Sequence, residues 1–162
     1  MAQPGRLRQQ AGRHALVDGI HKFDETKVDQ PILKQPDGTA KISKRDGRPA
    51  VTYFTSINFF QRHTLVACKP ITGRMHQIRL HISYLGAPIT GDELYGGKLF
   101  FLSDLKRKFN LKKETEEEPL IKRMALHAAS LEFRDLTDTV KTVEAPYPKD
   151  MHVLMKQLEK NG

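Results

Sequence analysis

The sequence predicts an α+β fold in which helices pack against a mostly antiparallel β-sheet. Two observations indicate this class. β-branched and aromatic residues gather in two pairs of short runs, and each pair is joined by a short turn, as in β-hairpins. Two other stretches repeat apolar residues at the spacing of an amphipathic helix. The chain has 162 residues, which is enough for one domain with its own core.

Five runs are predicted to be strands. The first hairpin joins residues 50–60 to residues 63–69, because both runs are rich in β-forming residues and are separated by a short polar turn. Residues 126–133 and 140–145 form the second hairpin. A short apolar run at residues 14–19 is the fifth strand.

The first helix is predicted to start near Gly73, between Thr72, a good N-cap, and Gly86, a good C-terminal stop. Its apolar residues recur at i, i+3, i+7 and i+10 and form one buried stripe: Met75, Ile78, Ile82 and Leu85. Arg79 lies only about 40° from this stripe, at about 100° per residue. Because a guanidinium keeps its charge, Arg79 needs an anionic or hydrogen-bonding partner.

Composition restricts the class of partner. The net charge of +8 and the isoelectric point of about 9.6 favour a polyanionic partner, RNA or DNA. The mean hydropathy of −0.53 and the absence of a long apolar run indicate a soluble protein without membrane contact. Cys68, the only cysteine, excludes an internal disulfide, favours a cytoplasmic location and is expected in the core. The spacing of the seven histidines predicts no metal site.

Six residues are predicted to contact RNA. Arg74, Gln77 and His81 share another side of the first helix, and His76 lies between them in the sequence. Residues 29–49 form a loop or irregular hairpin that is rich in turn residues and basic side chains. This loop is either solvated or in contact with phosphates, and its phosphate-binding candidates are Lys44 and Arg45.

The remaining segments are predicted with simpler arguments. Residues 1–13 are a flexible basic tail, and residues 98–113 form a helix with apolar residues on one face. Residues 114–119 are a mobile acidic loop. The chain ends in an amphipathic helix whose apolar residues are Met151, Leu154, Met155 and Leu158.

The stretch T-G-R-M-H-Q-I-R-L-H, followed by G-A-P-I-T-G-D-E-L-Y-G, resembles the third conserved motif of the RluA-type RNA pseudouridine synthases. The resemblance continues in L-H-A-A-S-L-E-F and E-A-P-Y-P-K-D-M, and it covers roughly Ala15 to Leu158. It implies a pseudouridine-synthase fold and the isomerisation of specific uridines in ribosomal or transfer RNA. It implies no metal, nucleotide or redox cofactor.

The same resemblance implies roles for two residues of the first helix. Arg79 corresponds to the arginine that forms an ion pair with the nucleophilic aspartate, and Ile78 corresponds to the aliphatic residue packed beside the active site. That aspartate lies in a His-Arg-Leu-Asp-Arg motif, which this sequence lacks. The most similar stretch is Lys44-Arg45-Asp46, which is not expected to be that motif. Arg13 stands where the family has a tyrosine that stacks on the uracil. Arg79 is therefore expected to be poorly paired, and Asp92 to have a structural role in its loop.

Residues 14–162 are accordingly expected to be the C-terminal part of a synthase catalytic domain, incomplete and inactive alone. The alternative is a non-catalytic RNA-binding module derived from the same fold. An aspartate motif encoded upstream would favour the first hypothesis. An incomplete domain is also expected to self-associate or to bind a complementary segment, because its sheet edges and apolar surface would be exposed.

Overall fold

The computed structural model describes residues 10–105 and 116–161. Its elements, in chain order, are β1 (Gln10–Asp18), β2 (Thr26–Asp29), β3 (Ile32–Lys34), β4 (Ala40–Ile42), β5 (Val51–Phe59), β6 (His63–Pro70), α1 (Gln77–Tyr84), η1 (Glu93–Tyr95), η2 (Leu102–Asp104), β7 (Leu126–Arg134), β8 (Val140–Glu144) and α2 (Lys149–Asn161). Of these, η1 and η2 are single turns of 3₁₀ helix.

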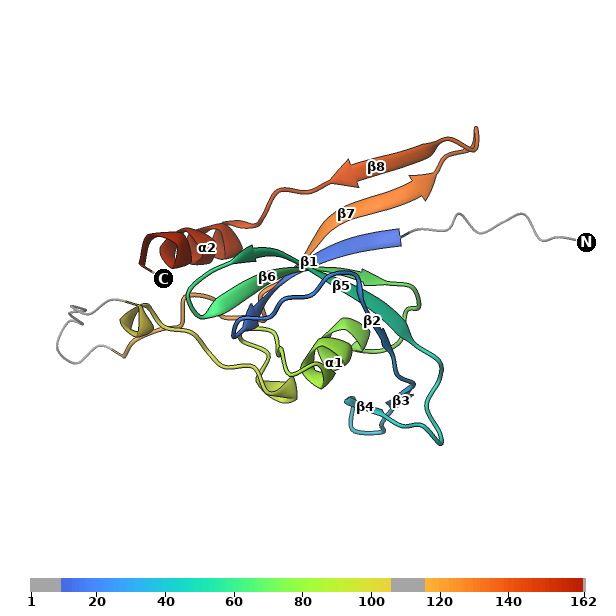
Figure 1. Ribbon diagram of the computed structural model, residues 1–162, viewed down its shortest axis with the longest axis horizontal. Coiled ribbons are helices and arrows are strands. Elements are labelled where there is room, and N and C mark those ends of the chain that lie inside the picture. Colours follow the sequence, from blue (N-terminus) through green and yellow to red (C-terminus); the bar gives the residue numbers. More distant parts are fainter. Residues whose placement is uncertain (1–9, 106–115, 162) are drawn as a thin grey trace, which may run out of the picture.

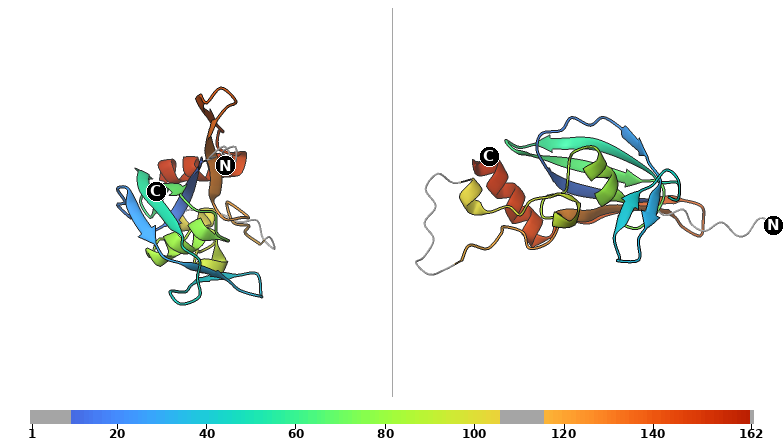
Figure 2. Two further views of the ribbon diagram at one scale, coloured as in Figure 1. Left: turned by 90° about the vertical axis from the view of Figure 1, so that its right-hand side faces the viewer. Right: turned by 90° about the horizontal axis from the view of Figure 1, so that it is seen from below.

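Six strands form one sheet in the order β2-β5-β6-β1-β7-β8, and all neighbouring strands are antiparallel. Figure 1 shows α1 and α2 on opposite faces of this sheet. The β3–β4 hairpin, here called the arm, projects beyond the β2–β5 edge, and the β7–β8 hairpin extends from the other edge (Figure 1, Figure 2). The predicted α+β class is confirmed.

The first predicted hairpin is confirmed as β5 and β6. Along β5, Thr52 and Phe54 are completely buried, whereas Tyr53 and Thr55 lie on the other face and are partly exposed. A strand alternates its side chains between the two faces of the sheet. The Thr52 face is the one that contacts α1, because the Thr52 hydroxyl hydrogen-bonds to His81 of that helix.

The predicted tail of residues 1–13 is wrong over its last four residues, because β1 begins at Gln10. β1 is a central strand that pairs with β6 on one side and with β7 on the other. The backbone groups of residues 10–13 are stabilised by pairing with the neighbouring strands. These residues show no alternation of apolar side chains, so the sequence alone does not predict a strand there. A register shift between Gly12 and Arg13 marks a bulge, a feature that re-aims side chains. Residues 1–9 lie outside the described residues.

The predicted helix of residues 98–113 is wrong wherever the structure describes it. Residues 98–101 are irregular, η2 is one short turn, and residues 106–113 lie outside the described residues. Carboxylate side chains accept hydrogen bonds from backbone N–H groups that a longer helix would pair with its own carbonyls. The Asp104 carboxylate accepts from the N–H of Phe101, and Glu117, in the predicted acidic loop, accepts from the N–H and hydroxyl of Ser103. The rest of that loop, residues 114 and 115, lies outside the described residues.

The C-terminal predictions are confirmed. β7 and β8 form the second hairpin, and α2 buries Met151, Leu154 and Leu158 in the main core. Cys68 also belongs to this core, where burial raises the pKa of its thiol and makes it an unreactive side chain. Neither helix in the described ranges is long and apolar enough to cross a membrane.

Candidate RNA-binding cleft

A cleft of about 470 Å³ lies beside α1, and most of the predicted site residues meet in it. Its walls are the segment that leads from β6 into α1, Arg13 of β1, and Met124 and Leu126 at the start of β7. The predicted site residues that line it are Arg74, His76, Gln77, Ile78 and Arg79. His81, Lys44 and Arg45 do not line the cleft.

The start of α1 differs from the prediction. The helix begins at Gln77 with His76 as its N-cap, so a start near Gly73 with Thr72 as the cap is wrong. The Thr72 hydroxyl instead accepts from the N–H of Val51 and donates to the Gln77 side chain. Thr72 therefore ties the approach to α1 to strand β5, and this tertiary contact outweighs its propensity to cap.

Gln77 is a structural residue rather than the predicted RNA contact. Its side-chain oxygen accepts from the Thr72 hydroxyl and from the N–H of Arg74, at 2.7 and 3.0 Å. Its amide nitrogen donates to the carbonyl of Val51 and to the Thr52 hydroxyl, at 2.9 and 3.0 Å. All four hydrogen-bonding sites of the amide are thus occupied, and the residue is only 4% exposed. Gln77 fixes the segment that carries Arg74 and His76.

His81 is likewise wrong as an RNA contact, because its side chain is fully buried. Its Nε2 lies 2.8 Å from the carbonyl of Gln30, which can only accept, so Nε2 carries the proton. Its Nδ1 lies 2.7 Å from the Thr52 hydroxyl, which then donates to it. Burial is the main cause that lowers the pKa of His81, so the neutral ring is the stable form.

The expectation that Arg79 is poorly paired is wrong, because its partner is Asp92. Nε and Nη2 of Arg79 donate to the two carboxylate oxygens of Asp92 at 2.9 and 2.7 Å, a bidentate pair. The side chains are 15% and 2% exposed, respectively. The hydrogen bond to Asp92 raises the pKa of Arg79 still further, against the opposing effect of burial. The Arg79 guanidinium also lies 4.9 Å from the centre of the Tyr95 ring, a cation–π distance.

Asp92 is held in place by a tight loop. Its carbonyl accepts from the N–H groups of Tyr95 and Gly97, and its own N–H donates to the carbonyl of Ile89. A Cβ atom at Gly97 would come within 1.9 Å of the Ile89 carbonyl oxygen, so this position admits only glycine. The loop presents Asp92 and Tyr95 to α1 in a fixed geometry.

The lining of the cleft combines positive charge with apolar surface. Arg74 is oriented by a hydrogen bond from its Nε to the carbonyl of Pro49. The side chain of Arg13 forms no hydrogen bond or ion pair with another described residue, so its guanidinium is available to a ligand. Buried Ile78, with Met124 and Leu126, supplies an apolar wall. Among the described residues that line the cleft there is no carboxylate.

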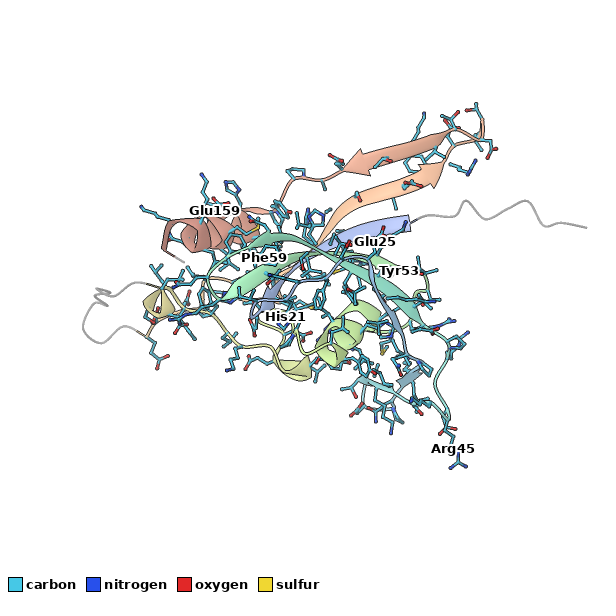
Figure 3. All side chains as sticks on the ribbon, viewed as in Figure 1. His21, Glu25, Arg45, Tyr53, Phe59 and Glu159 are labelled. Atoms are coloured by element: carbon cyan, nitrogen blue, oxygen red, sulfur yellow. The ribbon has the colours of Figure 1, made fainter. Side chains whose placement is uncertain are left out.

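Lys44 and Arg45 lie elsewhere, in the turn that follows β4. Both are exposed, and Figure 3 shows Arg45 at the tip of this turn, beside the arm and directed away from the body of the protein. The arm nevertheless connects to the cleft region, because the N–H of Ala40 in β4 donates to the hydroxyl of Tyr95. The same hydroxyl lies 2.7 Å from Nδ1 of His76.

A second hollow, of about 600 Å³, is larger but less suited to an anion. It lies on strands of the main sheet, and its lining includes Glu25 and Glu132 as well as Arg13 and Lys69. Opposite charges there largely cancel. The described residues also contain no group of three or more His, Cys, Asp or Glu side chains that could hold a metal ion. The cleft is therefore the better candidate site.

Met124 and Leu126 were not predicted as cleft residues, and Arg13 was not assigned to RNA binding. These three residues reach the cleft through the pairing of β1 with β7, which places Ala15 opposite Leu126. Such pairing leaves no local signal in the sequence. Only the position of Arg13, two residues before Ala15, could have indicated it, since the resemblance implies an active-site residue there.

Comparisons with known proteins agree with the family that the sequence resembles. The family model described as RNA pseudouridylate synthase matches residues 14–84. Over 150 residues the chain is 37% identical to the "uncharacterized RNA pseudouridine synthase YlyB" of Bacillus subtilis, and over 137 residues it is 38% identical to the ribosomal large subunit pseudouridine synthase D of Xanthomonas campestris. These matches cover 91% and 83% of this chain, respectively. The chain belongs to the RluA-type RNA pseudouridine synthases.

A solved structure supports the family at the level of the fold. The human protein "RNA Pseudouridylate Synthase Domain Containing 1" matches with a TM-score of 0.62 and 27% identity, over 87% of this chain and 56% of that one. The matches to the Bacillus and Xanthomonas synthases cover only 44% and 40% of those proteins. The chain thus spans less than half the length of these two relatives.

The burial of the His81 ring predicts that the protein is less stable in acid. In the unfolded chain His81 has the ordinary pKa of about 6.5, and in the folded protein its pKa is lower. The unfolded state then binds more protons, so the free energy of unfolding should fall as pH drops below about 6.5. Urea unfolding at several pH values measures this decline. His81→Leu should be less stable than the parent at neutral pH but should lose less stability in acid; equal losses would contradict the assignment.

Removing one partner of the Arg79–Asp92 pair should strongly lower the free energy of unfolding. Arg79→Met should destabilise the protein by about 3–5 kcal/mol, because it leaves the carboxylate of Asp92 buried without a counter-charge. Urea unfolding tests this value. Arg74→Met is the matched control and should cost only about 1 kcal/mol, the value of its hydrogen bond to Pro49. Asp92→Asn added to Arg79→Met should recover part of the loss. An Arg79→Met variant as stable as the parent would refute this role.

Proposed function

We propose that this chain forms the RNA-binding part of a pseudouridine synthase catalytic domain. The complete enzyme would isomerise specific uridines in RNA in the cytoplasm. Ribosomal RNA is the preferred candidate, because one similar relative is named a ribosomal large subunit synthase; transfer RNA is the alternative. The proposal joins family membership to the chemistry of the cleft.

The chemistry of the cleft is the observation that carries the proposal. A nucleotide offers an anionic phosphate and a flat, largely apolar base, and RNA-binding sites meet these with arginines and apolar or planar side chains. The cleft has Arg13 and Arg74 for the phosphate and Ile78, Met124 and Leu126 for the base. The arm adds positive charge outside the cleft, where it could follow the RNA backbone.

The proposed chemistry needs a residue from outside the described part of the chain. The family resemblance implies an aspartate nucleophile, but the described lining of the cleft has no carboxylate, and the carboxylate of Asp92 is bound by Arg79. We therefore propose that the aspartate comes from another segment of the complete protein or from a partner chain. The isolated chain would then bind RNA without isomerising it. Self-association of the chain remains a prediction.

The alternative is a non-catalytic RNA-binding module, which the same lack of a carboxylate would also fit. The two functions differ in what happens when the aspartate is supplied. A synthase fragment should gain activity, whereas a binding module should not.

RNA binding should weaken steeply as salt increases. Each phosphate contact on single-stranded RNA contributes about −0.7 to the slope of log affinity against log salt. Lys44→Ala combined with Arg45→Ala should make the slope shallower by about 1.4, the value of two contacts. Filter binding at several salt concentrations measures the slopes. Lys156→Ala combined with Lys160→Ala, on the exposed side of α2, is the charge-matched control and should change little. Affinity independent of salt would contradict the proposed electrostatic binding.

Tritium release from ribosomal RNA labelled at C5 of uridine tests the catalytic proposal. The chain alone should release only background tritium. A fusion that adds a segment with the His-Arg-Leu-Asp-Arg motif, which the family resemblance implies, should release tritium, and an Asp→Asn change in that motif should abolish the release. A fusion that binds RNA but stays inactive would favour the non-catalytic module. Release by the chain alone would place a nucleophile within these residues.

A further inference from the structure

The backbone of His76 adopts a conformation that is uncommon for a residue other than glycine. At the N-cap of α1 it has φ 53° and ψ 27°, in the left-handed region that favours glycine. Glu25 and Asp138 are the other described non-glycine residues with positive φ. Backbone strain of this kind persists only where the surrounding structure imposes it, and it is concentrated at functional sites. The imidazole ring of His76, which lines the cleft, is therefore a candidate functional group.

The hydrogen bonds around His76 determine which ring nitrogen carries the proton. The N–H of Ala40 donates to the Tyr95 hydroxyl at 3.0 Å, which leaves the hydroxyl proton free to be donated elsewhere. That hydroxyl lies 2.7 Å from Nδ1 of His76 and has no other acceptor among the described residues, so it donates to Nδ1. Nδ1 is then an acceptor, and the neutral ring carries its proton on Nε2. Nε2 has no hydrogen-bond partner among the described residues.

The surroundings of His76 keep the ring neutral. Burial lowers its pKa most, and the positive charge of Arg79 lowers it further, against a smaller opposing effect of Asp92. Arg79, Asp92 and Tyr95 act on the ring from the same helix and the adjoining loop, and the other charged groups that line the same cleft are Arg74 and Arg13. Most of the charged groups among them are cationic, which favours the neutral imidazole.

We propose that His76 is a specificity-determining residue whose Nε2–H donates a hydrogen bond to a carbonyl oxygen of the base held in the cleft. Tyr95 is its positioning residue, because it fixes the tautomer. This inference rests on the proposed function, since it assumes that the cleft takes a nucleotide. It assigns base recognition to His76 and leaves phosphate binding to the arginines.

The choice of a base carbonyl over a phosphate follows from charge. Arg13 and Arg74 already offer cationic donors to an anionic oxygen, and a nearby phosphate would favour the protonated form of His76 rather than the neutral one. A neutral N–H donor suits a neutral acceptor, such as O2 or O4 of uracil. The apolar wall of Ile78, Met124 and Leu126 on the same cleft also suits the flat face of a base.

Nitrogen-15 NMR of the histidine rings can test the tautomer without any ligand. His76 should show a protonated Nε2 and an acceptor Nδ1 at neutral pH, and Tyr95→Phe should convert this pattern to a mixture of tautomers. Uridine should then shift the Nε2 signal of the parent protein, whereas ribose 5-phosphate, which carries a phosphate but no base, should leave it unchanged. A shift with ribose 5-phosphate alone would overturn the assignment to the base.

Substitutions test the contribution to binding. His76→Gly removes the ring and suits the left-handed backbone, so the protein should remain folded and should bind uridine about threefold to tenfold more weakly, the value of one hydrogen bond. Asp138→Gly relieves a similar backbone conformation in the β7–β8 turn, outside the cleft lining, and is the matched control. Circular dichroism and thermal melting verify folding in both variants.

The outcomes separate this inference from the proposed function. If the parent binds RNA but His76→Gly binds uridine as tightly as the parent, the role of His76 is wrong and the cleft remains an RNA site. If neither RNA nor uridine binds, the proposed function fails, and base recognition by His76 fails with it. The tautomer measured without ligand would then report only the internal hydrogen bonds.

Discussion

The ion pair between Arg79 and Asp92 joins the two segments on which the candidate site depends. Arg79 belongs to α1, and Asp92 belongs to the glycine-containing loop that follows the helix. The pair sets the loop against the helix and so places Tyr95 beside the guanidinium. Tyr95 in turn contacts His76 in the cleft and Ala40 in the arm. A single buried charge pair thereby links α1, the cleft and the arm.

A second, uncharged network holds the other side of the same helix. Gln77, Thr52 and His81 form a continuous chain of hydrogen bonds between α1 and β5. A polar network of this kind stabilises a fold only when all its members are satisfied, and here the Gln77 amide and both nitrogens of His81 have partners. α1 is thus fixed to the sheet by neutral groups and to its loop by charged ones. His76, at the start of this fixed helix, lines the cleft and can contact a ligand without a conformational change.

The sequence predicted the elements better than the roles of their side chains. The β5–β6 hairpin and the terminal helix followed from their apolar patterns, because each buries its apolar residues in the core. The β7–β8 hairpin followed only from its β-forming residues, since β8 is exposed along its whole length. Gln77 and His81 looked like ligand residues because helical spacing placed them with Arg74, but spacing does not reveal that β5 and Gln30 cover them. The helix expected at residues 98–113 failed for a related reason, since Asp104 and Glu117 bind the backbone locally. The start of β1 and the cleft residues Met124 and Leu126 depend on strand pairing, which is a property of the folded chain.

The pairing of Arg79 with Asp92 is compatible with the role that the family resemblance implies for this arginine. A guanidinium has five N–H donors, and Asp92 occupies one on Nε and one on Nη2. Arg79 also lines the cleft, so its remaining donors can meet a second carboxylate brought there by another segment. Asp92 would then orient the arginine before that carboxylate arrives. A cation held in this way lowers the pKa of an incoming carboxyl group and keeps it ionised, which is the state a nucleophilic aspartate needs.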